Sequence, residues 1–143
     1  NTTFLQLMYC ILRQESAMPR ILLVDDDKDI LDIIRLDLED DPANAVDTTS
    51  TAAEAITKVT RTPYDVIIAD WRMPGMNGTD LIRKLRSDGC ASFIILYTGY
   101  SLSSDIRTTL DCGADHYLHR GGNPDLEFAE LHRLIKFVAG KKA

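Results

Sequence analysis

The sequence lacks the features that mark several common classes of protein. Its three cysteines, Cys10, Cys90 and Cys112, are scattered without a Cys-x-x-Cys pair, which argues against a disulfide framework or zinc site and favours a reducing cytoplasm. No apolar run approaches the ~20 residues of a membrane span. The net charge of −6 argues against a nucleic-acid surface, which normally needs a basic stripe. Internal repeats and low-complexity linkers are also missing, so the chain is expected to form a single soluble domain with its own core.

The first 18 residues are set apart from the rest of the chain. NTTFLQLMYCILRQESAM starts without Met and has only a short apolar stretch. It also lacks the charged start and the cleavage site of a secretory signal. Two interpretations stay open: a tag remnant, misassigned start or loose tail, and a helix that docks on this domain or on a second copy. Residues 1–18 are therefore taken as an N-terminal extension and residues 19–143 as the domain.

Apolar runs alternate with helical patterns along the domain, at the spacing of β–α units. Strands are expected at residues 21–24, 45–48, 65–69, 93–97 and 116–118. Helices are expected at residues 27–39, 51–60, 79–86 and 101–111, and a last helix is opened by Asn123 and Pro124. Five strands that alternate with five helices predict an α/β fold, in which a doubly wound parallel sheet is covered on both faces.

Residues that can carry out chemistry follow the predicted strands. Asp25 and Asp26 follow the first, Asp70 the third, Thr98 the fourth and Arg120 the fifth. In an open parallel sheet, ligands bind beyond the carboxyl ends of the strands, so these side chains are expected to converge on one rim. Clustered carboxylates repel one another unless a cation is present, and Mg²⁺ prefers oxygen ligands. An aspartate beside such an ion can accept a phosphoryl group, whose charge a hydroxyl and a cationic side chain help to neutralise.

Four segments in this order resemble the receiver domain of two-component response regulators, the CheY-like family. They are ILLVDDDKDI, YDVIIADWRMPGMNGTDLIRKLR, FIILYTGY and GADHYLHR. The resemblance covers nearly everything from residue 19 onward. It implies a flavodoxin-like five-stranded fold with strand order 2-1-3-4-5. It also implies a cytoplasmic phosphorelay module that receives a phosphoryl group from a sensor histidine kinase or phosphotransfer protein. Such a module is not an enzyme, although it promotes its own phosphorylation and dephosphorylation.

The resemblance also implies roles for single residues. Asp70 would be the phosphoacceptor, and Asp25 and Asp26 would bind Mg²⁺ together with Asp70 and the backbone carbonyl of Arg72. Thr98 would contact the phosphoryl group and take part in the switch.

In the same family, Tyr117 would change rotamer on activation. The face made by the helix at 101–111, the strand at 116–118 and the last helix would bind a downstream protein or a second copy. No nucleic-acid or membrane partner is expected. We expect no output domain in these 143 residues, and two interpretations stay open, a stand-alone receiver and a part of a larger protein.

The fifth strand departs from the family pattern, which has Lys followed by a cis Pro where this chain has Arg120 and Gly121. Arg is not equivalent to Lys, and a cis bond before a residue other than Pro is costly. We therefore expect a trans bond before Gly121, a looser loop and a cation that can be displaced from the site. Arg72 and Tyr100 are bulky at positions that gate water in the family, so slow hydrolysis of the phosphorylated aspartate is expected.

These departures leave a second reading open, a degenerate pseudo-receiver that acts as a protein-interaction module. A flavin carrier is excluded because the first loop is acidic rather than hydroxyl- and glycine-rich, and an aspartate-nucleophile phosphatase because Arg72 stands where that class has a second Asp. His116 and His119 are expected on opposite faces of a strand, where they cannot share a metal, and His132 on the surface of the last helix.

Overall fold

Five strands and four helices make up the part of the chain that the computed structural model describes, residues 3–5, 18–99 and 111–142. The strands are β1 (Arg20–Val24), β2 (Ala45–Thr49), β3 (Val66–Ala69), β4 (Phe93–Thr98) and β5 (His116–His119). The helices are α2 (Lys28–Glu39), α3 (Ala52–Arg61), α4 (Gly78–Ser87) and α6 (Pro124–Lys142). Wherever the sequence predicted the first or last residue of one of these elements, the observed bound differs from it by no more than one residue. The helix predicted at 101–111, except for its last residue, and most of the N-terminal extension lie outside the described residues.

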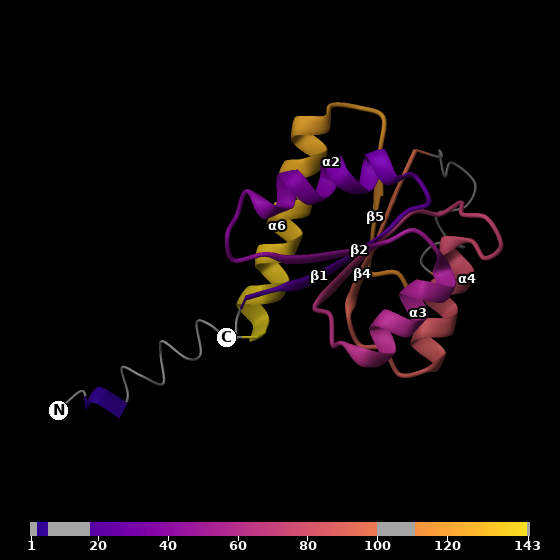
Figure 1. The fold of residues 1–143 in the computed structure, drawn as a ribbon. Coiled ribbons are helices and arrows are strands. Elements are labelled where there is room, and N and C mark those ends of the chain that lie inside the picture. The colour runs from indigo at the N-terminus through magenta and orange to yellow at the C-terminus, as the bar shows by residue number, and fades with distance from the viewer. Residues whose placement is uncertain (1–2, 6–17, 100–110, 143) are drawn as a thin grey trace.

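The strands form a single sheet in the order β2-β1-β3-β4-β5, and every neighbouring pair is parallel. This confirms the predicted order 2-1-3-4-5. Helices α2 and α6 lie together on one side of the sheet, and α3 and α4 lie on the other (Figure 1). A parallel sheet covered in this way needs strands that are apolar throughout. Residues 21–24 of β1 satisfy this need, since none is more than 1% exposed.

Alternate residues of each strand contribute to separate layers of the core. Leu22 and Val24 of β1 pack in the layer under α3 and α4, whereas Ile21 and Leu23 pack in the layer under α2 and α6. The buried residues of α2 recur at the spacing of one helical face; they are Leu31, Ile34 and Leu38. Because apolar side chains fill both layers of the core, polar side chains can gather instead at the rim formed by the carboxyl ends of the strands.

Three consecutive aspartates, Asp25, Asp26 and Asp27, follow β1, and the third of this acidic run belongs to the start of a helix rather than to the rim. Asp27 is the N-cap of α2, and its side chain accepts hydrogen bonds from the backbone N–H groups of Asp29 and Ile30. This role leaves Asp25 and Asp26 as the two residues of the run that can serve a site.

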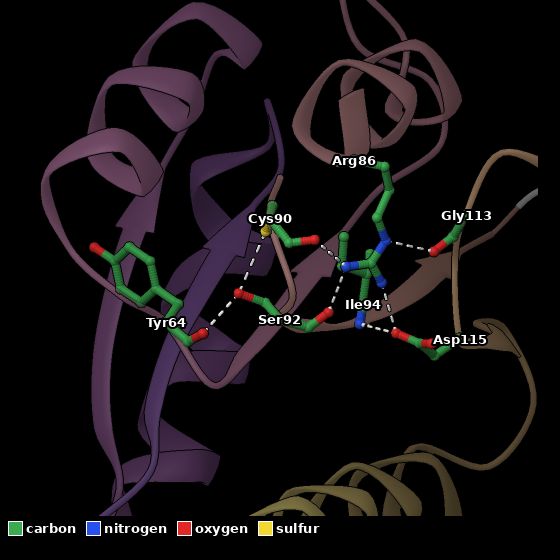
Figure 2. A network of polar contacts seen from close by, with 7 residues as sticks. All are labelled: Tyr64, Arg86, Cys90, Ser92, Ile94, Gly113 and Asp115. Carbon is green, nitrogen blue, oxygen red and sulfur yellow. Dashed lines mark hydrogen bonds and ion pairs between the residues drawn. The ribbon is translucent and has the colours of Figure 1, made fainter. Parts of the chain in front are cut away.

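A network around Arg86 ties the end of α4 to the loops before β4 and β5 (Figure 2). The Arg86 guanidinium group donates to the carbonyl oxygen of Gly113 at 3.0 Å and to those of Cys90 and Ser92, both at 2.8 Å. It also pairs with the Asp115 carboxylate at 2.8 Å. Gly113 has φ +105, a backbone conformation that favours glycine. One side chain therefore fixes how β5 enters the sheet.

His132 lies on α6 and is partly exposed, as expected, but it has a partner that the sequence did not indicate. Its Nε2 atom lies 2.9 Å from a carboxyl oxygen of Asp37, so it joins α6 to α2. Both side chains are partly buried. The sequence pattern placed each of them correctly on its helix, but the contact depends on how the two helices pack on the sheet.

Candidate functional site

Three carboxyl groups meet at the carboxyl end of the sheet. Asp25 and Asp26 follow β1 and Asp70 follows β3, and the backbone N–H of Asp70 donates to the carbonyl of Val24 at 2.9 Å, which holds the two strand ends together. Oxygen atoms from all three carboxyl groups lie within 4.8 Å of one another. The structure thus brings together the aspartates that the sequence placed at separate strand ends.

Asp25 is held from two sides. One of its carboxyl oxygens accepts the backbone N–H of Asp27 at 2.9 Å, and the other lies 3.3 Å from Nη1 of Arg120. The residue is only 4% exposed. Its neighbour Asp26 is exposed, so the cluster opens to solvent on that side.

Asp70 is equally enclosed and has a hydroxyl beside it. It is 6% exposed, and its Oδ1 atom accepts the backbone N–H of Trp71 at 2.8 Å. The side chain of Thr98, which ends β4 and is fully buried, also hydrogen-bonds to the Asp70 carboxylate. Parallel pairing of β3 with β4 is what delivers this hydroxyl to the aspartate.

Burial and crowding disfavour the charged forms of two of these carboxyl groups. The pKa of Asp25 is raised from 3.8 to about 6; burial is the main cause and the Asp70 carboxylate adds to it, while the N–H of Asp27 and the Arg120 cation oppose the rise. Burial also raises the pKa of Asp70 above its ordinary value, against the hydrogen bond from Thr98 and the charge of Arg120. The protein's own donors therefore leave an excess of negative charge, which a divalent cation would offset.

Arg120 lies at the site and is not displaced from it in this structure. Its guanidinium group pairs with Asp25 as given above, and its backbone N–H donates to the carbonyl of Thr98 at 2.7 Å. The described residues contain no cis peptide bond, which confirms the trans bond before Gly121. Gly121 has φ +127, a conformation that turns the chain away from the sheet without strain.

The loop after Asp70 depends on a glycine for a reason that the sequence does not show. A Cβ atom placed on Gly78 would lie 2.1 Å from the carbonyl oxygen of Asp70. The N–H of Gly78 donates to the carbonyl of Trp71 at 2.5 Å. The start of α4 therefore packs directly on the backbone of Asp70, and only a residue without a side chain permits that approach.

The remaining candidate residues surround this centre. Arg72 is exposed, with its guanidinium carbon 5.5 Å from the centroid of the Trp71 ring. Tyr117 of β5 is half-buried and packs against the core layer under α3 and α4. Tyr100 lies outside the described residues. His116 and His119 belong to no metal-binding cluster among the described residues, where the aspartate cluster is the single such group found.

Two residues near Arg120 were missed by sequence reasoning. The hydroxyl of Tyr97 donates to Oε1 of Glu127 at 2.7 Å, and both residues are buried. A tyrosine within an apolar strand is a signal that a polar partner is needed. The sequence offers no way to find that partner in the first turn of α6.

Two named response regulators are similar in sequence to this part of the chain. A nitrate/nitrite response regulator protein homolog of Haemophilus influenzae is 33% identical over 121 residues, which are 82% of this chain and 57% of the relative. The nitrate/nitrite response regulator protein NarP of Escherichia coli is 36% identical over 113 residues, 78% of this chain and 53% of the relative. The chain thus spans about half the length of these relatives.

Solved structures agree in fold. The Francisella response regulator 1452 receiver domain superposes with a TM-score of 0.78 at 25% identity, covering 87% of this chain and 99% of that one. The response regulator protein TrrA of Thermotoga maritima, in complex with Mg²⁺-BeF, has a TM-score of 0.71 at 31% identity, covering 84% and 98%. None of the helices in the described ranges has the length and apolarity needed to cross a bilayer.

The family model for the response regulator receiver domain matches residues 21–131. That span contains the whole aspartate cluster, Thr98 and Arg120. The same span includes β1 from Ile21 onward, the other four strands, α2, α3 and α4, and α6 as far as Leu131. This chain therefore belongs to the family of response regulator receiver domains of two-component signalling.

Proposed function

We propose that Asp70 accepts a phosphoryl group in a reaction that depends on Mg²⁺ held by Asp25, Asp26, Asp70 and the backbone carbonyl of Arg72. The observation that carries the proposal is the convergence of three carboxyl groups within 4.8 Å at one rim of the sheet. Oxygen donors of this kind suit Mg²⁺, which keeps several waters and is commonly bound through one or two carboxylates. The ion would neutralise charge on the incoming phosphoryl oxygens. The raised pKa values of Asp25 and Asp70 fit a centre built for a cation.

The chain's own residues would act on the phosphoryl group from three sides. An Asp70 oxygen attacks the phosphorus of a phosphohistidine; the P–O bond forms as the P–N bond breaks, and the electron pair leaves with the imidazole. The Thr98 hydroxyl, already bonded to the Asp70 carboxylate, turns its donor to a phosphoryl oxygen. The Arg120 guanidinium group lies on the same rim and offsets the added charge.

The donor is proposed to be a sensor histidine kinase or a phosphotransfer protein in the cytoplasm. We place the read-out of phosphorylation at Thr98 and Tyr117, because β4 and β5 are neighbours in the sheet and Leu96 of β4 is in register with Tyr117. A downstream protein or a second copy would bind the face that includes β5 and α6. The half-buried state of Tyr117 supports this assignment, since its ring can be exchanged between core and surface.

The proposal is tested by intact mass after incubation with acetyl phosphate and Mg²⁺. We expect the chain to gain the mass of one phosphoryl group, and expect no gain for Asp70→Asn or when Mg²⁺ is chelated. The same assay follows decay after the donor is removed. Slow decay is expected, because Arg72 and Tyr100 are bulky at the positions that gate the attacking water in the family.

A wild-type chain that stays unmodified while folded would overturn the proposal and favour the pseudo-receiver. Modification that persists in Asp70→Asn would place the acceptor elsewhere. Decay within seconds would contradict the expected hindrance by Arg72 without affecting the choice of acceptor.

A further inference from the structure

The guanidinium group of Arg120 rests on a buried aromatic ring. Its central carbon lies 5.3 Å from the centroid of the Tyr97 ring, a distance at which a cation and a ring face attract. Tyr97 is 2% exposed, so the ring is a fixed surface. From this position Nη1 of Arg120 reaches Asp25 at 3.3 Å.

The ring is in turn fixed by α6. The Tyr97 hydroxyl donates to Oε1 of Glu127 at 2.7 Å, and Glu127 is 8% exposed. Burial and this hydrogen bond raise the pKa of Tyr97, so its hydroxyl keeps its proton and remains a donor. The backbone N–H of Glu127 donates to the carbonyl of Asn123, at the start of α6. A chain of contacts thus runs from the first turn of α6 through the ring to the cation.

The backbone that follows Arg120 restrains its side chain little. Gly121 and Gly122 follow it, and glycines limit the backbone less than other residues do. A cavity of about 240 Å³ adjoins the guanidinium group. The apolar side chains that line this cavity belong to Ile30, Ile33, Ile34, Pro124 and Phe128. Without the ring, the Arg120 side chain has open space into which it can swing away from Asp25.

We propose that Tyr97 and Glu127 are positioning residues, which hold the Arg120 guanidinium group at the rim where the phosphoryl group of Asp70 is to be bound. The inference rests on the proposed function of Asp70, and it explains how an arginine followed by glycines stays in the site. Tyr97 acts through its ring face, and Glu127 acts by fixing the ring. Neither residue touches the phosphoryl group.

The first test is a double-mutant cycle on the rate of Asp70 phosphorylation by acetyl phosphate, measured by intact mass. We expect Tyr97→Leu to slow phosphorylation by about threefold to thirtyfold, the factor that corresponds to the loss of a partly desolvated cation–ring contact. In a chain that already carries Arg120→Ala, we expect Tyr97→Leu to cause no further slowing. Tyr97→Phe keeps the ring and should slow phosphorylation less than Tyr97→Leu. Glu127→Ala breaks the same hydrogen bond as Tyr97→Phe, so we expect it to slow phosphorylation to a similar extent, and a wild-type rate for Glu127→Ala would overturn the role of Glu127.

Mg²⁺ binding, followed by Trp71 fluorescence, separates positioning from general damage. The Tyr97 variants keep all three aspartates, so we expect Mg²⁺ affinity to be retained while phosphorylation slows. Equal slowing by Tyr97→Leu with and without Arg120→Ala would overturn the inference, as would a wild-type rate for Arg120→Ala alone. A parallel loss of Mg²⁺ binding would also overturn it.

A second readout does not depend on phosphorylation. In the NMR spectrum of the wild-type chain, we expect the side-chain Nε–Hε signal of Arg120 to be shifted by the Tyr97 ring, and to move to the position of an unrestrained arginine in Tyr97→Leu. An Arg120 signal that is the same in both proteins would overturn the inference. If the chain accepts no phosphoryl group, the proposed function fails, whereas this signal still decides whether Tyr97 holds Arg120.

Discussion

Single residues at the rim are constrained by backbone proximity as much as by side-chain chemistry. Gly78 illustrates this, because the start of α4 meets the carbonyl group of Asp70 with no space for a Cβ atom. The contact fixes the position of α4 relative to Asp70. A side chain at Gly78 must therefore push α4 away or distort the strand end that carries Asp70.

We predict that Gly78→Ala lowers the free energy of unfolding by about 3 kcal/mol, because the new methyl group overlaps backbone atoms that cannot move aside. The matched control is Gly140→Ala in α6, where a Cβ atom meets nothing within 4 Å and should add roughly 0.5–1 kcal/mol of stability. Urea unfolding of both variants measures the difference. A Gly78→Ala variant as stable as wild type would contradict the close approach.

At the scale of elements, one arginine near the end of α4 hydrogen-bonds this helix to the loops before β4 and β5. The Asp115 carboxylate that pairs with Arg86 also accepts the backbone N–H of Ile94 at 2.8 Å. The network therefore couples α4, the first residues of β4 and the turn before β5 (Figure 2). Strand β5 carries Tyr117 and leads to Arg120, so the network fixes the path of the strand that supplies the cation.

We predict that Arg86→Ala lowers the free energy of unfolding by about 2–4 kcal/mol, because several partly buried carbonyl groups and Asp115 lose their donor. Arg86→Lys should restore little, since a single ammonium group cannot replace the planar fork. On the same helix, Arg83 pairs with Asp80 at 3.5 Å in an exposed position, so Arg83→Ala should change stability by no more than ~0.5 kcal/mol. Thermal and urea unfolding of the three variants distinguish these outcomes, and equal effects at the two positions would contradict the network's role.

At the scale of the whole molecule, negative charge on the aspartate cluster lowers the free energy of unfolding when no cation is bound. The folded pKa of Asp25, about 6, lies above the ordinary value of 3.8. Between these two values the folded chain holds a proton that the unfolded chain releases, so stability falls as the pH rises through this window. The penalty is complete above pH 6 and disappears as the pH falls toward 3.8. A bound cation would remove it where it is largest.

We predict that Mg²⁺ raises the stability of the chain at neutral pH, by roughly 2.7 kcal/mol at about a hundredfold excess over its Kd. The gain should shrink as the pH falls below 6, because the ion must then displace a proton from Asp25. Without Mg²⁺, Asp25→Asn should be more stable than wild type near neutral pH, and this advantage should fade as the pH is lowered. Asp26→Asn, at the exposed position, is the matched control. Urea unfolding with and without Mg²⁺ at several pH values checks both expectations, and a gain that is independent of pH would contradict them.

The sequence by itself determined the element order, the parallel sheet, the strand order through its family resemblance, and the aspartates that end β1 and β3. These features follow from patterns among residues that are close together in the sequence, namely apolar runs of strand length, helical periodicity and capping residues such as Asp27. The convergence of Asp25, Asp70 and Thr98 also followed, because parallel strands place their carboxyl ends at one edge.

Only the tertiary structure decided how Arg120 stays in the site, why Gly78 cannot carry a side chain, and that His132 reaches Asp37. Each depends on contacts between residues far apart in the sequence, such as Tyr97 with Glu127, and on the packing of helices against the sheet. Local patterns specify which face of an element is buried. They do not specify which atoms meet across that face, because that is set by the position of each helix over the strands.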